Sequence, residues 1–130
     1  MKNILIIGAG KSSSTLVKYL LDTSEQEALF ITIADISTEN ANKLINKHRN
    51  AEAIILDVFD KHQREEQIQK ADIVISMLPA RFHLDVAKDC ITFNKHMVTA
   101  SYISDEMKAL DAEAKKKGLV FMNEIGLDPG

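Results

Sequence analysis

The fold is decided by the stretch Ile4-Leu5-Ile6-Ile7-Gly8-Ala9-Gly10-Lys11-Ser12-Ser13. Its first four residues form a short β-branched apolar run, which is typical of a strand buried on both faces. Glycine ends this run at once, and Leu16, Val17, Leu20 and Leu21 then recur at the spacing of one helical face. A strand that passes through G-x-G into a helix is the context of a dinucleotide-binding loop.

The chemistry of this loop depends on its small residues. Gly8 permits a tight turn, and Gly10 has no side chain to keep a pyrophosphate away from the backbone. The helix that follows offers free N–H groups and the positive end of its dipole to a phosphate. Ser13 replaces the third glycine of the usual fingerprint, although a small residue still allows close packing of helix and strand. The predicted pyrophosphate-binding residues are Gly8, Ala9, Gly10, Lys11, Ser12 and Ser13. The alternative is a tight turn in which small residues serve packing alone.

Strands and helices continue to alternate after the loop. Apolar runs predict strands at 29–34, 53–56, 73–75, 97–99 and 119–122, with helices between them. Ser37 and Asp60 are predicted N-caps, the helix over 61–69 is polar and mostly exposed, and Gly118 closes a helix over 105–117. Short connections and near-continuous apolar strands predict an α/β fold, a doubly wound parallel sheet of about six strands of the Rossmann type. Residues 1–130 form one domain in this interpretation.

Three strand ends supply the other candidate cofactor-binding residues. Asp35 ends the second strand, where a carboxylate accepts hydrogen bonds from ribose hydroxyls and repels a 2′-phosphate, so NAD is favoured and NADP remains possible. The alternative for Asp35 is a solvated acid at a strand end. Asp57 and Val58 are expected near the adenine, with a cap or exposed turn as the equal alternative for Asp57. The candidates are Asp35 and Ile36 at the end of the second strand, and Asp57 and Val58 at the end of the third. At the end of the fourth strand, where the nicotinamide half is expected, they are Ser76, Met77, Leu78 and Pro79. Simple strand termination by the proline is the alternative for the last group.

Composition excludes several other classes of function. The formal net charge is −3, whereas binding of nucleic acid or an anionic membrane favours a basic face. No apolar run approaches the length of about 20 residues that a spanning helix needs. The lone Cys90 cannot form an internal disulfide, suits a reducing, cytoplasmic setting, and falls on an apolar stripe where a packed thiol is expected. No metal-ligand spacing occurs, and His83 beside Arg81 is a minor catalytic candidate whose alternative is a structural role.

Several motifs in the second half of the chain are similar to one family. They are Ala71-Asp72-Ile73-Val74-Ile75-Ser76-Met77-Leu78-Pro79, Met97-Val98-Thr99-Ala100-Ser101-Tyr102-Ile103-Ser104 and Asn123-Glu124-Ile125-Gly126-Leu127-Asp128-Pro129-Gly130. On these residues the chain resembles saccharopine dehydrogenase, and its loop at residues 8–14 resembles the bacterial members. The resemblance runs over the whole chain.

The resemblance implies an oxidoreductase of lysine metabolism that interconverts saccharopine with glutamate and 2-aminoadipate 6-semialdehyde, using NAD or NADP. It implies Ser101, Tyr102 and Asp128 as substrate-side candidates, and an amino-acid substrate held mainly by a second domain expected after Gly130. A homodimer through that domain is one assembly that the resemblance allows. Two alternatives remain open: a regulatory NAD(H)-sensing domain of a potassium-transport system, and a polyamine enzyme similar to carboxynorspermidine dehydrogenase.

Overall fold

Strands and helices alternate along the chain in the computed structural model, which describes residues 2–8, 14–45, 48–77, 83–99, 112–119 and 121–122. The strands are β1 (Lys2–Ile7), β2 (Leu29–Asp35), β3 (Ala51–Ile55), β4 (Ile73–Ser76), β5 (His96–Thr99) and β6 (Phe121–Met122). The helices are α1 (Ser14–Glu27), α2 (Thr38–Ile45), α3 (Lys61–Lys70) and α4 (His83–Thr92), and residues 112–116 are also helical.

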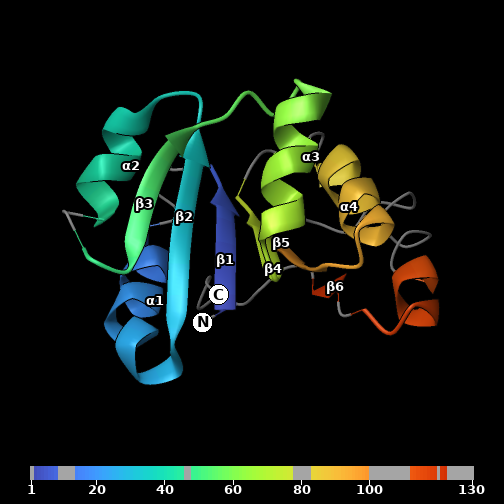
Figure 1. Ribbon diagram of the computed structural model, residues 1–130, viewed down its shortest axis with the longest axis horizontal. Helices are drawn as coiled ribbons and strands as arrows, with labels where there is room; N and C mark the ends of the chain where they lie inside the picture. Colours follow the sequence, from blue (N-terminus) through green and yellow to red (C-terminus); the bar gives the residue numbers. More distant parts are fainter. Residues whose placement is uncertain are drawn as a thin grey trace, which may run out of the picture.

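All six strands join one parallel sheet in the order β3-β2-β1-β4-β5-β6, so β3 lies at one edge. The order reverses direction at β1, because the chain first moves outward to β3 and then returns to β4 on the other side. In Figure 1 the arrowheads of β1, β2 and β3 all point to the top of the view. This is the predicted doubly wound Rossmann-type sheet, and in such sheets ligands bind beyond the carboxyl ends of the strands, near the reversal.

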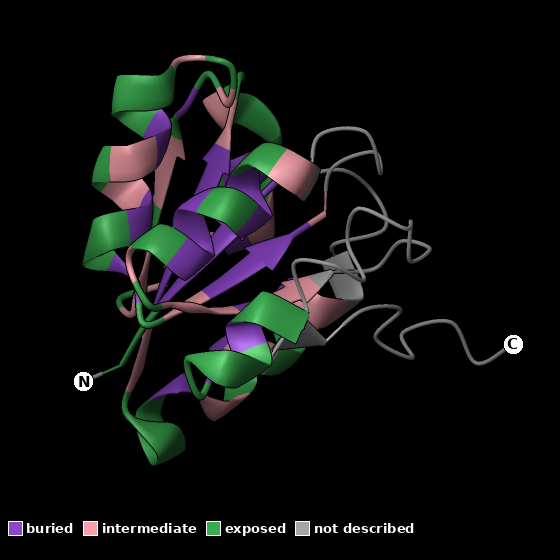
Figure 2. Cartoon of the chain, turned by 90° about the vertical axis from the view of Figure 1, so that its right-hand side faces the viewer, coloured by how far each residue is buried: buried purple, intermediate pink, exposed green. Residues whose placement is uncertain are grey.

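Helices cover both faces of the sheet and create two apolar cores, because alternate residues of each strand point to opposite faces. Leu5, Ile7 and Val74 belong to the core that α3, α4 and residues 114–119 cover. Ile4, Ile6 and Ile31 belong to the core beneath α1 and α2. Figure 2 shows the buried strands between helices whose outward surfaces are exposed.

Local signals set several element boundaries. The Ser37 hydroxyl accepts a hydrogen bond from the Glu39 N–H (3.3 Å), and the Asp60 carboxylate accepts one from the Gln63 N–H (3.2 Å), so both predicted N-caps are confirmed. Gly118 has φ +75°, and the Leu119 N–H donates to the Ala114 carbonyl (2.9 Å), which is a glycine-closed helix end. The first turn of this helix, predicted over 105–117, lies outside the described residues.

One predicted boundary was wrong, and two polar side chains are more buried than the sequence around them indicates. β3 begins at Ala51 rather than Ala53, because the strand pairs with Ile31 from that residue onward. The helix α3 is mostly exposed, as predicted, although it buries Arg64 and Ile68. His48 is half-buried, and its Nδ1 accepts a hydrogen bond from the Asn50 N–H (3.1 Å).

Candidate dinucleotide-binding site

Backbone hydrogen bonds connect the carboxyl ends of β1, β2 and β4 and the residues that follow β3, so these strand ends lie together at one end of the sheet. The Gly8 N–H donates to the Ala34 carbonyl, and the Met77 N–H donates to the Ile7 carbonyl, each over 2.8 Å. The Leu56 N–H donates to the Asp35 carbonyl over the same distance. Gly8 is buried and has φ +103°, a conformation that favours glycine. The turn after β1 therefore needs a residue without a side chain, as the sequence predicted.

A pocket of about 170 Å³ lies at this edge. It is lined by Ile7, Gly8, Ala34, Asp35, Ile36, Leu56, Asp57, Val58 and Phe59. Two of these side chains, Ile36 and Phe59, are unusually exposed for large apolar residues, at 76% and 68%. Apolar side chains around a concave site are what a flat aromatic base requires. The pocket thus brings together the predicted residues of β1, β2 and β3.

Asp35 stands at the rim of this pocket. Its Oδ1 accepts a hydrogen bond from the Ile36 N–H (2.6 Å), so the carboxylate is held beside the turn that follows β2. Among the described residues that line the pocket, none carries a positive charge. A carboxylate at the end of this strand suits ribose hydroxyls better than a phosphate.

Asp57 organises the wall on the β3 side. Its Oδ1 accepts from the Phe59 N–H (3.0 Å), its carbonyl accepts from the Asp60 N–H (3.0 Å), and its N–H donates to Gln63 Oε1 (3.2 Å). Asp57 therefore builds a turn, as its alternative interpretation held, and the same turn lines the pocket. Phe59 was missed in the sequence because a single aromatic residue in a polar turn has no periodic pattern around it.

The remaining candidates divide into two groups. Ser76 is buried at the end of β4, and Met77 packs against the core beneath α1. Many others lie outside the described residues: Ala9, Gly10, Lys11, Ser12, Ser13, Leu78, Pro79, Ser101, Tyr102 and Asp128. Nothing is described of the side chain of His83, the minor catalytic candidate, which begins α4.

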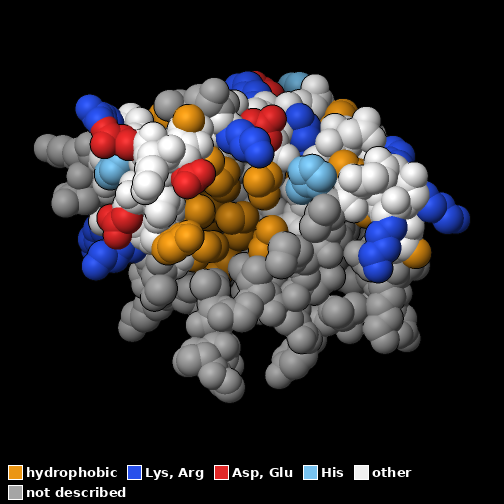
Figure 3. Space-filling model, turned by 90° about the horizontal axis from the view of Figure 1, so that it is seen from below, with side chains coloured by type: hydrophobic (Ala, Val, Ile, Leu, Met, Phe, Trp, Pro, Cys, Tyr) orange, Lys and Arg blue, Asp and Glu red, His pale blue; other side chains and the backbone are white. Residues whose placement is uncertain are grey.

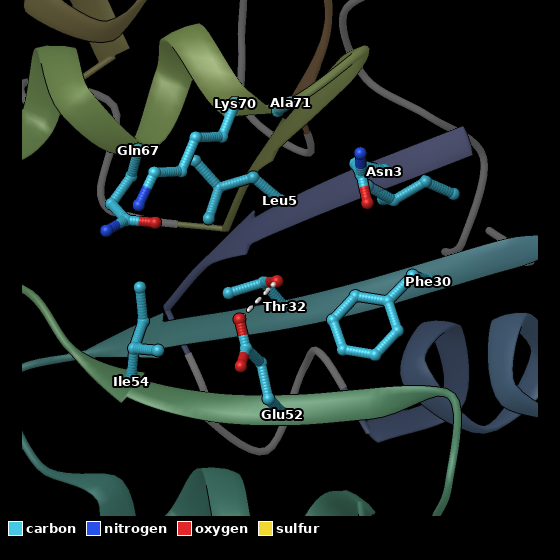
Figure 4. A pocket seen from close by; sticks show the side chains of 10 residues that line it. Asn3, Leu5, Phe30, Thr32, Glu52, Ile54, Gln67, Lys70 and Ala71 are labelled. Atoms are coloured by element: carbon cyan, nitrogen blue, oxygen red, sulfur yellow. Dashed lines mark hydrogen bonds between the residues drawn. The ribbon is translucent and has the colours of Figure 1, made fainter. Parts of the chain in front are cut away.

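Larger hollows lie elsewhere and have different chemistry. One of about 500 Å³ lies on the open face of β2 and β3, where Lys70 and Gln67 reach from α3 toward Thr32 and Glu52 (Figure 4). The Thr32 hydroxyl donates to Glu52 Oε1 there (3.3 Å). This hollow includes Asn3, near the start of β1, and neither Gly8 nor Asp35 lines it.

Another hollow, of about 690 Å³, lies by the amino-terminal ends of β1, β2 and β4. Tyr19 and Leu20 of α1 line it together with Ile73. Figure 3 shows apolar side chains gathered on the lower side of the molecule. It lies at the sheet edge opposite to the one that dinucleotides use in this fold. Size alone would favour these two hollows, but the glycine turn and the carboxylate favour the small pocket.

The described residues contain no cluster of three or more histidine, cysteine or acidic side chains that could hold a metal ion. Cys90 is buried within the core, and this burial, together with the nearby Asp89 carboxylate, raises the pKa of its thiol despite the opposing effect of Lys95. A thiol of this kind is a packed core residue, as predicted. In the described part of the chain, no helix is long and apolar enough to cross a membrane.

Comparison with known proteins decides the family. Residues 4–122 match the family described as the saccharopine dehydrogenase NADP binding domain. The chain belongs to this family. It is 39% identical over 129 residues to saccharopine dehydrogenase (NADP(+), L-glutamate-forming) of Pyricularia oryzae, covering 99% of this chain and 28% of that protein.

Two further relatives support the same assignment. The chain is 33% identical to alpha-aminoadipic semialdehyde synthase of Arabidopsis thaliana, covering 98% of this chain and 14% of that protein. It is similar in structure to apo saccharopine dehydrogenase (L-Glu forming) from Saccharomyces cerevisiae, with a TM-score of 0.86, 35% identity and coverage of 100% of this chain and 28% of that one. Members of this saccharopine dehydrogenase family thus match nearly the whole chain, while the chain spans less than a third of their length. The resemblance recognised in the sequence is confirmed, and the chain is an NAD(P)-binding domain related to these enzymes.

Proposed function

We propose that this chain is the cofactor-binding part of a saccharopine dehydrogenase-like oxidoreductase, with the adenosine half of the dinucleotide in the pocket between Gly8 and Phe59. The observation that carries the proposal is this pocket, where a positive-φ glycine, a strand-end carboxylate and exposed apolar side chains meet. A buried Gly8 at φ +103° suits a backbone that must leave room for a pyrophosphate. Family membership supports the same function.

The bound dinucleotide would supply hydride transfer to or from the carbon beside the secondary amine of saccharopine. In this proposal the turn after Gly8, including Ala9, Gly10, Lys11, Ser12 and Ser13, holds the pyrophosphate. Ser76, Met77, Leu78 and Pro79 line the nicotinamide half, and Ser101, Tyr102 and Asp128 face the substrate. Residues 1–130 act as one domain, and a further domain holds most of the amino-acid substrate and forms any homodimer. A reducing, cytoplasmic location remains a prediction from the single cysteine.

We further propose that NAD is preferred to NADP. Asp35 lies at the pocket rim, and the described residues that line the pocket include no cation to receive a 2′-phosphate. The matching family and the relative from Pyricularia oryzae carry NADP in their names. A preference for NAD would therefore set this chain apart from that relative.

The experiment is a calorimetric titration of the chain with NADH. Gly10→Val should abolish or strongly weaken binding, because a branched side chain would occupy the space of the pyrophosphate, while circular dichroism shows a folded protein. Gly118→Ala is the matched control, since Gly118 closes a helix end remote from the pocket and has no atom within 4 Å of an added Cβ. Unchanged affinity in Gly10→Val, or no binding by the unaltered chain, would rule the proposal out.

A further inference from the structure

A buried arginine on α3 connects the pocket wall to the neighbouring helix α4. Arg64 on α3 is only 7% exposed, and Asp89 on α4 is 8% exposed. The Arg64 Nε donates to the Asp89 carboxylate, and its Nη1 donates to the Val58 carbonyl (2.9 Å). One guanidinium thus holds a side chain of α4 and a backbone carbonyl of the turn before α3.

Stability alone does not explain this arrangement. Removing two charges from water costs about as much as a buried pair returns, and well-packed apolar residues often stabilise such a site equally well. A guanidinium has a feature that apolar residues lack, because its rigid planar fork holds two acceptors at fixed positions. The carbonyl it holds belongs to Val58, which lines the pocket between Asp57 and Phe59.

The rest of the same turn is held from α3 itself. Asp57 is tied to Gln63 on the first turn of that helix, and the Asp60 carbonyl accepts from the Arg64 N–H (2.9 Å). These bonds fix the turn relative to α3 but not relative to the neighbouring helix. The Arg64 guanidinium also binds Asp89 on α4, which packs against α3, and so fixes the turn relative to α4 as well.

We propose that Arg64, held by Asp89, is a positioning residue that sets the place of the Val58 carbonyl and with it the Asp57–Phe59 wall of the adenosine pocket. This inference rests on the proposed function, because it assigns a role in the same pocket. The fork acts on the adenosine half of the ligand and leaves the nicotinamide half untouched. Its loss should therefore weaken the two halves unequally.

The test compares two fragments of the dinucleotide, AMP and nicotinamide mononucleotide, together with intact NADH. Arg64→Lys keeps the charge but not the fork, and it should weaken AMP and NADH binding about tenfold, which lies within the range known for residues that act on a site without touching the ligand. Binding of nicotinamide mononucleotide should stay unchanged. Amide signals of Val58 and Phe59 should shift in the free protein. Arg49→Lys, an exposed arginine paired with Glu25, is the matched control and should change nothing.

A second variant distinguishes a loss of positioning from a folding defect in Arg64→Lys. Asp89→Asn keeps an acceptor for Arg64 Nε and should weaken AMP binding less than Arg64→Lys does. The double variant should be no worse than Arg64→Lys alone, because both changes act through one contact. Equal loss of AMP and nicotinamide mononucleotide binding in folded variants, or unchanged AMP affinity, would overturn the positioning role. Failure of the unaltered chain to bind AMP or NADH would instead overturn the proposed function.

Discussion

Replacing Asp35 by asparagine should remove the discrimination between NAD and NADP. Asparagine keeps an oxygen that can accept the Ile36 N–H but carries no charge, so the turn after β2 should persist. At a half-buried rim an effective dielectric constant of about 20 applies, and two unit charges about 7 Å apart then repel by about 2 kcal/mol. That repulsion corresponds to about 30-fold in affinity. We therefore expect NAD to bind the unaltered chain about 30-fold more tightly than NADP.

The assay is calorimetric titration of both dinucleotides at low ionic strength, repeated at higher salt. The affinity ratio should fall to within about threefold of unity in Asp35→Asn, and salt should reduce it in the unaltered chain because the repulsion is screened. Asp57→Asn serves as the control, since this second carboxylate of the pocket is engaged in its own turn and should affect NAD and NADP by the same factor. Equal affinities in the unaltered chain, or a ratio that survives Asp35→Asn, would refute the reasoning.

Three further outcomes are expected. The 130-residue chain should form no NADH from saccharopine, while a full-length relative does so under the same conditions. Correct positioning of the reacting carbon lowers the activation barrier by about 7–11 kcal/mol, and one wall of a site cannot provide it. Comparable rates would locate the catalytic groups within this chain. Because the pKa of the buried Cys90 thiol is raised, this thiol ionises at lower pH in the unfolded chain than in the folded one. Above about pH 9, the free energy of unfolding measured in urea should therefore fall by up to about 1.4 kcal/mol per pH unit relative to Cys90→Ala. Parallel pH profiles of the two proteins would contradict this. Gly118→Ala should lower the free energy of unfolding by roughly 1–2 kcal/mol through its left-handed backbone alone, whereas a thermal melt without a shift would show that the helix end adapts.

The framework of the fold could be predicted because its signals are local. Short β-branched runs ended by glycine predict parallel strands, and side-chain caps such as Asp60 mark where helices begin. The position of Asp35 followed from the same pattern, since a residue that ends the strand beside β1 must lie at the carboxyl edge of the sheet.

Interactions between distant residues could not be predicted in this way. The composition of α3 indicates exposure, and the partner that buries Arg64 lies 25 residues further along the chain on another helix. Phe59 is a single aromatic residue in a polar turn, and only the folded chain brings it next to Ile36 around one pocket. Both features depend on the packing of α3 against the sheet, which periodicity does not describe.

The edge position of β3 has a consequence for the behaviour of the protein in concentrated solution. An edge strand presents backbone groups that can pair with another molecule, and natural proteins guard such strands by shortness and charge. β3 has only five residues, and Glu52 interrupts a stretch that continues as Ala53-Ile54-Ile55, with Ile55 68% exposed. We therefore expect the Glu52 carboxylate to oppose strand-to-strand aggregation, independently of any ligand at the opposite end of the strand.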